Sequence, residues 1–304
     1  MNSTSCPICM MNSPSLIWPR SDLGYWICQN CGHCNKFNET GDVKRSFEEA
    51  QNKYFGESSQ LLITAPNPLE EEILAKRKRV LSRIGRSSID VLEVGPGSGF
   101  ILSWLLSQGH RVTAVEHSKV LALQISMNFD AKVIQGEFET CEVETNSMDA
   151  FCSFHVIEHV QDPFKHLRKA YSLVRPGGLA FVATPSANSW EHRISPSFSP
   201  NFDSAHFRVF SFESLRRTCE AAGWTIVETY TPDYTSGWLR VGTKLLRRLR
   251  HEDEEKTAGK YASGSSSAFK MTCWAARIGT YPLRAIQGSL GSGNELFFVL
   301  QKRG

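Results

Sequence analysis

The chain has 304 residues and a formal net charge of +3, with 34 Lys and Arg residues against 31 Asp and Glu. A hydrophobic content of 41% is typical of a globular protein with a core, and the small charge does not by itself argue for nucleic-acid binding. No apolar run reaches the roughly 18–20 residues that a membrane-spanning helix needs. The first residues lack the basic and apolar regions of a secretory signal, so we expect a cytoplasmic protein.

Five of the nine cysteines lie in the first 34 residues. Four of them form the segments CPIC and CQNC and are Cys6, Cys9, Cys28 and Cys31. Two C-x-x-C pairs at this separation suit one tetrahedral Zn²⁺ with four thiolate ligands. Apolar and aromatic residues between the pairs predict two short strands, so residues 1–50 are expected to form a zinc ribbon. His33 and Cys34 are expected to lie nearby without binding the metal.

Residues 51–85 are expected to be a linker followed by one helix, PNPLEEEILAKRKRVLSRIG. Asn67 can cap this helix, and Pro68 fits its first turn. The basic run Lys76–Arg79 lies in the later half of the helix. We interpret the run as a solvated helix face, and a stripe of phosphate contacts for RNA is the alternative.

A new pattern at Ile89 marks a larger domain, predicted over residues 86–304. Short apolar segments alternate there with helical patterns, which predicts an α/β fold with a doubly wound, mainly parallel sheet. Ligands of such sheets bind at the carboxyl ends of the strands, where the strand order switches. The expected strands are 89–94, 110–118, 131–138, 148–156 and 179–185, and the expected helices are 100–110, 118–129 and 162–178.

The first expected strand leads into a glycine-rich loop, VLEVGPGSGF, in which Gly95, Gly97 and Gly99 follow Glu93. The dinucleotide pattern G-x-G-x-x-G needs its third glycine where Phe100 stands. The Gly-Lys-Ser/Thr of a Walker phosphate loop is also absent. Because glycines let a ligand approach the backbone closely, the loop predicts a cofactor that is not held through a pyrophosphate.

The segment EVGPGSG closely resembles motif I of the class I S-adenosylmethionine-dependent methyltransferases. Other segments resemble the later motifs of this family in the same order: TAVEHS, VIQGEFE, FHVIEHVQDPFKHL, LVRPGGLAFVATP, AHFRVFSFESLRRTCEAAGWTIVE and NELFFVLQK. The resemblance covers roughly residues 70–304. It implies a Rossmann-like sheet of seven strands with an antiparallel last strand, and S-adenosylmethionine as the cofactor.

The resemblance also implies roles for individual residues. The glycines and Glu93 would lie beside the amino-acid tail of the cofactor, and Glu116 would hold the ribose hydroxyls. Glu137 would meet the adenine amino group, with Phe138 packed beside it, and His155 would line the pocket. The full set of expected cofactor contacts is Glu93, Gly95, Gly97, Gly99, Glu116, His117, Glu137, Phe138 and His155.

The acceptor is less constrained by the sequence. HVIEHV stands where adenine-N6 methyltransferases carry Asp/Asn-Pro-Pro-aromatic, and Cys152 is expected in the core rather than as a nucleophile. Residues 1–60 contain five Lys/Arg and six Asp/Glu, which leaves few uncompensated cations for phosphate. The layout resembles enzymes of sugar, glycan and natural-product pathways, so we expect O- or C-methylation of a small-molecule or glycan acceptor, with nucleic acid disfavoured. A ribosomal-RNA methyltransferase with a zinc ribbon, and a catalytically silent cofactor-binding module, are the alternatives.

Methyl transfer often requires a base that takes a proton from the acceptor, and histidine suits this role at neutral pH. His206, in FDSAHFRVFS just before an expected helix, is the first choice for the base. His159 is the second candidate. In some relatives from quinone pathways, similar Glu-His elements have been linked to a divalent cation, which would give Glu158 and His159 a role in metal binding.

A helical insert is expected at about residues 234–292, before the last strand. It contains a basic helix over 238–250, a polar loop, and an apolar-faced helix over 269–286. The two helices could cap the acceptor site or form a homodimer contact. The basic helix could also contact a membrane surface.

Overall fold

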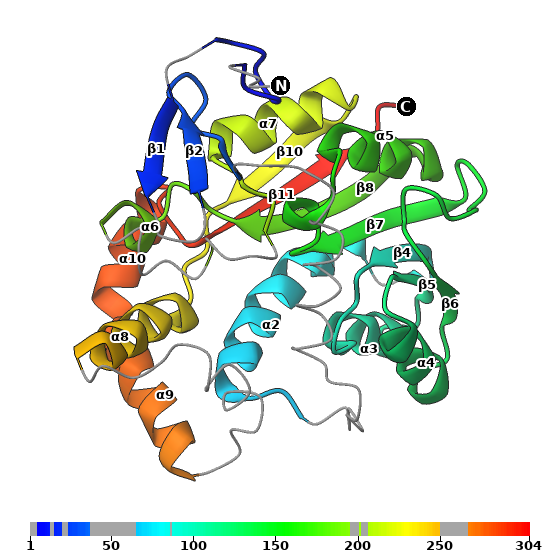
Figure 1. The fold of residues 1–304 in the computed structure, drawn as a ribbon. Coiled ribbons are helices and arrows are strands. Elements are labelled where there is room, and N and C mark those ends of the chain that lie inside the picture. Colours follow the sequence, from blue (N-terminus) through cyan, green and yellow to red (C-terminus); the bar gives the residue numbers. More distant parts are fainter. Residues whose placement is uncertain are drawn as a thin grey trace.

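The computed structural model describes residues 5–12, 15–19, 24–36, 65–85, 87–194, 201, 206–249 and 267–304 (Figure 1). Most of the linker before the first long helix and the polar loop of the insert lie outside the described residues. The domain boundaries expected at residues 50 and 85 stay predictions. Within the described ranges, no helix is both long and apolar enough to cross a bilayer.

The larger sheet has seven strands in the order β10-β11-β8-β7-β4-β5-β6. Five neighbouring strands from β8 to β6 are parallel, and β11 lies antiparallel between β8 and β10. This confirms the expected doubly wound, Rossmann-like sheet with an antiparallel last strand. The strands are β4 (Asp90–Val94), β5 (Arg111–Glu116), β6 (Lys132–Gln135), β7 (Met148–Phe154), β8 (Val174–Pro185), β10 (Thr225–Tyr230) and β11 (Glu295–Gln301).

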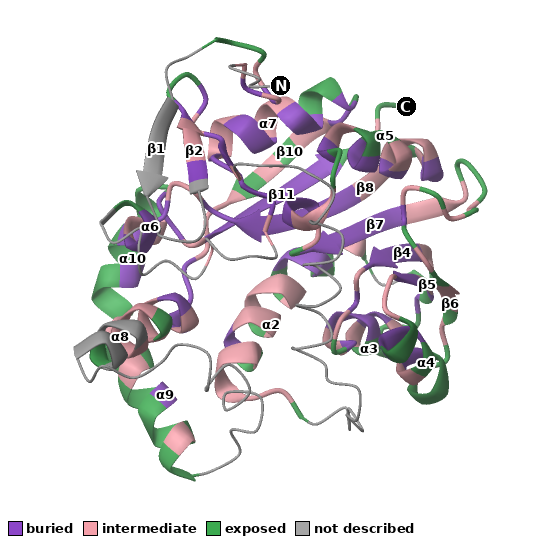
Figure 2. Ribbon diagram, in the orientation of Figure 1, coloured by how far each residue is buried: buried purple, intermediate pink, exposed green. Residues whose placement is uncertain are grey.

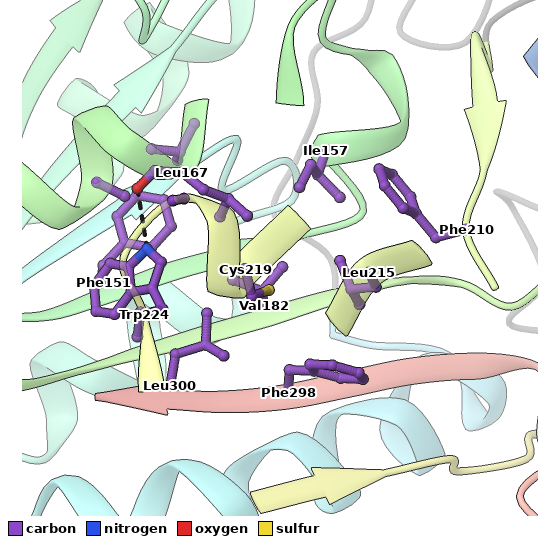
Figure 3. Close-up of a cluster of buried hydrophobic side chains, with 14 of the residues drawn as sticks. Phe151, Ile157, Leu167, Val182, Phe210, Leu215, Cys219, Trp224, Phe298 and Leu300 are labelled. Atoms are coloured by element: carbon purple, nitrogen blue, oxygen red, sulfur yellow. Dashed lines mark hydrogen bonds between the residues drawn. The ribbon is translucent and has the colours of Figure 1, made fainter. Parts of the chain in front are cut away.

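Each face of this sheet has its own hydrophobic core, because successive side chains of a strand point to opposite faces. Val91 packs in the core beneath α2, α3 and α4, and Leu92 packs in the core beneath α5 and α7. Figure 3 shows part of the second core, where the indole of Trp224 donates to the Leu167 carbonyl at 3.0 Å. These helices are α2 (Pro68–Leu81), α3 (Phe100–Ser107), α4 (Lys119–Asn128), α5 (Pro163–Leu173) and α7 (Phe212–Ala221).

The strand order switches at the pair β4–β7. β5 and β6 continue on one side of β4, and β7 and β8 continue on the other. Val94 pairs with Ser153, so the loops after β4 and β7 leave the same edge of the sheet side by side. A Cβ atom on Gly95 would lie only 2.7 Å from Cγ2 of Val156, which shows that the two loops touch. Open α/β sheets bind their ligands at this position.

The helix expected over 162–178 is shorter in the structure. α5 begins after Asp162, whose side chain accepts from the amides of Phe164 and Lys165, and it ends at Leu173. The segment RPGG belongs to β8 instead. Pro176 accounts for the difference, because proline cannot donate a helical hydrogen bond and disfavours helical backbone in the residue before it.

A second, smaller sheet has the order β1-β2-β3-β9. β1 (Ser15–Pro19) and β2 (Gly24–Cys28) form the antiparallel hairpin expected between the cysteine pairs. β3 (Cys34–Lys36) pairs with β2 on one side and with β9 (Arg208–Val209) on the other. The cysteine segment therefore shares a sheet with a segment of the larger domain, whereas the sequence analysis treated the two as separate.

The insert is helical, as expected, but it contains three described helices rather than two. They are α8 (Thr235–Leu249), α9 (Ser267–Gly279) and α10 (Tyr281–Ser289). Pro282 in the first turn of α10 explains why the single helix expected over 269–286 is divided. The remaining short elements are η1 (Ser82–Ile84), η2 (Ile157–His159) and α6 (Trp190–Ile194).

Candidate cofactor and acceptor site

The glycine loop between β4 and α3 has a conformation that glycine adopts most readily. Gly95, Gly97 and Gly99 have φ angles of 64°, 54° and 72°. A Cβ atom at Gly99 would lie 2.6 Å from Phe129, and one at Gly95 would meet Val156. Gly97 differs, because its Cβ position faces open space. The outer glycines allow close packing of the loop, and Gly97 leaves an approach for a ligand.

Glu116 lies at the end of β5, beside this loop. The side chain is buried, and Oε1 accepts from the Ser118 amide at 2.9 Å. Burial raises the pKa of Glu116, and the amide groups of Ser118 and Gly97 oppose that rise. The carboxylate therefore lies beside the amide of Gly97, and its expected role at a ribose stays a prediction. The carbonyl of His117 accepts from Gln135 at the neighbouring end of β6.

Of the two expected cofactor contacts that follow β6, one is exposed and the other is buried. Glu137 is exposed at the carboxyl edge of the sheet, where a ligand could reach it. Phe138 is buried and packs against Phe151 and the ring of His166, with ring centroids 5.6 and 4.9 Å away. This position favours a core role for Phe138, and its expected place beside the adenine stays a prediction.

Glu93 is the buried acid directly before the glycine loop. Oε2 of Glu93 has no hydrogen-bond partner in the part of the chain that the structure describes. Burial raises the pKa of Glu93 to about 8, although the positive charge of Arg77 opposes that rise. A buried carboxyl group with an unsatisfied oxygen costs free energy unless a ligand supplies a partner. This group fits the cationic, hydrogen-bond-donating end of the expected cofactor.

Three residues that the sequence analysis named for the acceptor site come together. The rings of His159 and His206 stack with centroids 4.6 Å apart. Oε1 of Glu158 lies 4.0 Å from Nε2 of His206 and 3.4 Å from Nδ1 of His155, while Oε2 accepts from Thr184 at 2.9 Å. Ligand atoms of Glu158, His159 and His206 all lie within 4.8 Å of one another, so this set could hold a divalent cation.

A run of buried charges connects this cluster to α2. Glu295, at the start of β11, is buried and accepts from Nη2 of Arg77 at 2.6 Å and from the Tyr234 hydroxyl at 2.8 Å. Nε2 of His155 lies 2.6 Å from the same carboxylate. Despite burial, the charges of Arg77 and His155 lower the pKa of Glu295 to about 2. The guanidinium of Arg77 also lies 4.9 Å over the ring of Phe154.

The interpretation of Lys76–Arg79 as a solvated face is therefore wrong for Arg77, and Lys76 is only partly solvated, with 40% of its side chain exposed. Arg77 is largely buried, and Lys76 donates to the Asp233 carbonyl and lies 4.5 Å over the ring of Tyr234. Arg79 alone of the four is exposed. A sequence signal was present, since Arg77 stands four residues from both Ile73 and Leu81 on the apolar stripe of the helix.

Other histidines occupy core positions. His192, which lies on α6, is buried, and burial lowers its pKa to about 3. It is therefore neutral at physiological pH. His166 is fully buried, with Nδ1 2.7 Å from Glu139 and Nε2 3.4 Å from Ser153. Cys152 is buried in β7, as expected of a core residue.

The four cysteines predicted to bind zinc also come together. Sγ of Cys6 lies 3.7 Å from Sγ of Cys31, and Sγ of Cys9 lies 3.6 Å from Sγ of Cys28. A zinc tetrahedron with Zn–S bonds of about 2.3 Å has S···S edges of about 3.8 Å, so these separations fit the metal. Cys34 is not part of the group, and its Sγ faces the Gly32 carbonyl.

The cysteine module is in direct contact with the segment that carries His206. The Tyr25 hydroxyl donates to the His206 carbonyl at 2.6 Å, and the Lys36 amide donates to the Phe207 carbonyl at 2.9 Å. Ser211 donates to the Cys31 carbonyl. The ring of His33 packs edge-on against Phe210, with centroids 5.1 Å apart. His33 therefore contributes to this contact rather than to the thiolate group.

Comparison with known proteins identifies the class of protein that this fold and site define. Residues 68–229 match the family described as "Methyltransferase domain", which is more than half of the chain. The chain belongs to this methyltransferase family.

Two curated relatives and one solved structure are similar to the chain. A protein of Mycolicibacterium smegmatis named "Probable S-adenosylmethionine-dependent methyltransferase" is 26% identical over 174 residues, 55% of this chain and 65% of that protein. A ubiquinone biosynthesis O-methyltransferase of Xanthomonas campestris is 31% identical over 112 residues, 34% of this chain and 46% of that protein. The chain thus spans less than two thirds of either relative. The phosphoethanolamine N-methyltransferase 2 of Haemonchus contortus, solved with S-adenosylhomocysteine, shares the fold with a TM-score of 0.55 and 15% identity, over 95% of this chain and 71% of that one.

We predict that cofactor affinity rises with pH through the titration of Glu93. Its carboxyl group is protonated below a pKa of about 8, and a cationic ligand binds better to the ionised form. Affinity for S-adenosylmethionine should therefore increase by up to about tenfold per pH unit below this pKa and level off above it. Calorimetric titration of the wild type and of Glu93→Gln measures the effect. The amino group of the cofactor titrates in both proteins, so parallel pH profiles would contradict the prediction.

We predict opposite outcomes for two neighbouring arginines of α2. Arg77→Gln leaves Glu295 buried without its main partner and should lower the free energy of unfolding by about 3–5 kcal/mol. Arg79→Gln removes the same charge from an exposed position and should change it by less than about 0.5 kcal/mol. Urea denaturation of both variants provides the measurement. Equal effects would show that the ion pair of Arg77 contributes little.

Proposed function

We propose that this chain uses S-adenosylmethionine to methylate a small-molecule or glycan acceptor, at a hydroxyl oxygen or an acidic carbon. The main support is that the glycine loop and the cluster of Glu158, His159 and His206 meet at one edge of the sheet. Membership of the methyltransferase family supports the reaction class. The names of the two curated relatives support the cofactor, and one of them supports transfer to oxygen.

The cofactor site in this proposal is built from the predicted residues. The open face of Gly97 admits the ligand, and Glu116 stands beside it at the end of β5. Glu93 contributes a buried carboxyl group with an unsatisfied oxygen, and Glu137 reaches the same edge from the end of β6. The bound cofactor would supply a methyl group on a sulfonium, an electrophile that needs no further activation by the protein.

The acceptor side of the proposal rests on His206. The acceptor oxygen forms the new O–CH₃ bond while the C–S bond breaks, and the acceptor proton passes to Nε2 of His206. Glu158 stabilises the resulting imidazolium from 4.0 Å, and the stacked ring of His159 restricts the orientation of the base. A divalent cation held by the same three residues is the competing account of acceptor activation.

An RNA acceptor has less support. The basic run of α2 would have to supply phosphate contacts, but Arg77 is bound to Glu295 and Lys76 to the Asp233 carbonyl. Cations that are already paired inside the protein release little free energy on meeting a phosphate. A catalytically silent cofactor-binding module remains the second candidate, since the expected cofactor contacts do not include His159 or His206. Turnover measurements separate it from the enzyme.

Turnover with labelled S-adenosylmethionine and a panel of hydroxylated metabolites and glycans tests the proposal. His206→Ala should lower kcat by roughly 10²-fold or more and leave the thermal shift caused by S-adenosylhomocysteine unchanged. Gly97→Arg should abolish that shift, because the side chain would fill the open approach. Gly109→Arg is the matched control, because Gly109 also has positive φ and open space but lies after α3, away from the loop.

Three results would contradict parts of this proposal. Binding of a nicotinamide dinucleotide in place of S-adenosylmethionine would overturn the cofactor. Unchanged turnover in His206→Ala would overturn the base. Loss of turnover with a chelator, restored by a divalent cation, would assign acceptor activation to a metal at Glu158, His159 and His206.

We further propose that Cys6, Cys9, Cys28 and Cys31 hold one structural Zn²⁺. The S···S separations support a tetrahedral site, and the four-thiolate donor set is typical of structural zinc. Through β3 and Tyr25 the module contacts the backbone of residues 206–209, so the metal would stabilise the position of His206 without touching the acceptor.

Cys28→Ser should therefore release the metal and also lower turnover. We expect close to one zinc per chain in the wild type by metal analysis and a clear loss in the variant. Hydrogen exchange at residues 207–211 should become faster, while the thermal shift from S-adenosylhomocysteine persists. Cys34→Ser is the matched control, because Cys34 is a neighbouring cysteine outside the thiolate group. A variant without metal whose turnover and exchange match the wild type would refute the coupling.

A further inference from the structure

Most residues of the helices α9 and α10 are exposed (Figure 2). Several of these exposed residues are large and apolar. On α9, Met271, Trp274 and Ile278 recur at the spacing of one helix face, and Met271 and Trp274 are 71% and 67% exposed. Of the described side chains of α9, only Cys273 is buried. The stripe thus faces away from the rest of the protein.

The arrangement on α10 is the reverse of an ordinary amphipathic helix. Leu283, Ile286 and Leu290 recur along its solvent face, while Arg284 and Gln287 are buried beneath it. A surface helix normally buries its apolar residues and exposes its polar ones.

Hydrogen bonds hold the polar face of α10 against the protein. Nη1 of Arg284 donates to Glu72 at 2.7 Å, and Nε2 of Gln287 donates to Glu191 at 2.6 Å. The indole of Trp238 donates to Oε1 of Gln287 at 3.2 Å. These contacts fix the helix with its apolar face outward, so the exposure of that face follows from specific bonds.

The junction of α9 and α10 combines apolar, aromatic and cationic groups. A groove of about 380 Å³ is lined by Trp274, Arg277, Ile278, Tyr281 and Pro282. Lys270 and Arg277 are exposed along the same helix as the apolar stripe. Trp and Tyr with basic residues beside an apolar face are the composition of protein surfaces that enter the headgroup region of a bilayer.

The three helices of the insert carry charges of one sign. The sequences of α8, α9 and α10 contain no Asp or Glu. They contain the cations Arg240, Lys244, Arg247, Arg248, Lys270, Arg277 and Arg284. Of these, Lys270 and Arg277 are exposed beside the apolar face, whereas Arg284 is buried against Glu72. Such a surface is complementary to anionic lipids, which attract basic residues at the membrane interface.

We propose that the outward face of α9 and α10 docks on an anionic lipid bilayer, with Trp274 and Ile286 entering the interface and Lys270 and Arg277 meeting lipid phosphates. The inference is independent of the acceptor and of the methyl-transfer reaction. It differs from the expectation for residues 238–250, because the apolar contact is formed by the later two helices.

A second copy of the chain fits this face less well. A two-fold dimer contact brings the same patch of both subunits together. Lys270 and Arg277 would then face their own copies, with no acidic residue on α8, α9 or α10 to compensate. Like charges across an interface oppose association. A bilayer with anionic headgroups offers apolar and negative groups together.

Flotation of the full chain with lipid vesicles tests the proposal. The protein should float with phosphatidylcholine vesicles that contain phosphatidylglycerol, should float much less with pure phosphatidylcholine, and should detach as salt rises. Trp274→Ser with Ile286→Ser should lower the partition coefficient by roughly tenfold or more. Lys270→Gln with Arg277→Gln should lower it on anionic vesicles to a similar degree.

Two matched controls come from α4. Leu123→Ser with Met127→Ser removes two equally exposed apolar residues from another helix. Lys119→Gln with Lys132→Gln removes two exposed cations from α4 and the adjoining β6. Neither pair should change vesicle binding. If the α4 pairs reduce flotation as much as the α9–α10 pairs, the proposed face is wrong.

Fluorescence quenching by brominated lipids places the contact directly. Wild-type emission should be quenched on anionic vesicles, and Trp274→Phe, which keeps the apolar character, should still bind but lose part of that quenching. Unchanged quenching in this variant would overturn the proposal. So would light scattering that shows a dimer without lipid and a monomer after Trp274→Ser with Ile286→Ser, because a second copy would then cover the face.

Discussion

The pairing of β3 with β9 is the contact on which the arrangement of the candidate site depends. In this pairing Val209 lies opposite Cys34, and Arg208 lies opposite Asn35. Just before β9, the backbone carbonyl of His206 accepts a hydrogen bond from the Tyr25 hydroxyl. A two-residue strand has too few hydrogen bonds to be stable without a neighbouring sheet. The cysteine module supplies that sheet and so holds the segment between the acceptor cluster and α7. The cysteine module therefore positions the backbone of residues 206–209.

Electrostatic contacts between α2 and Glu158 are the second constraint on the arrangement of the candidate site. Between α2 and the cluster of Glu158, His159 and His206, Arg77 contacts Glu295, and His155 lies between Glu295 and Glu158. Most of these groups are withdrawn from water. Burying ions in this way gives little net stability, because desolvation offsets the Coulomb attraction. Their effect is to fix the positions of these side chains, because a buried charged group is destabilised if its partner moves away. The raised pKa of Glu93 arises in the same region, where Arg77 only partly offsets the cost of burial.

The sequence was sufficient for features that local patterns determine. The strand–helix alternation predicted the sheet, and the pattern around Gly95, Gly97 and Gly99 predicted a glycine loop between a strand and a helix, which the structure contains. The four cysteines were found from the spacing of two pairs.

Features formed between distant segments were missed. β9 is two residues long and has no pattern of its own, and the burial of Arg77 depends on Glu295, more than two hundred residues away. The outward apolar face of α10 arises because Arg284 and Gln287 find partners on α2 and α6.

His155 connects the glycine loop after β4 with the cluster of Glu158, His159 and His206. It has a φ of 56°, a left-handed conformation that is unfavourable for a residue with a Cβ atom. Such a backbone costs about 1–3 kcal/mol and persists only where surrounding contacts impose it. Here the His155 amide donates to the Ala183 carbonyl at 2.8 Å, and the ring lies between Glu295 and Glu158. The turn directs Val156 onto Gly95 of the cofactor loop and Glu158 toward His206. One strained residue at the end of β7 therefore sets the relation between the glycine loop and the cluster of Glu158, His159 and His206, and the contacts of His155 with Glu295 and Glu158 hold it in place.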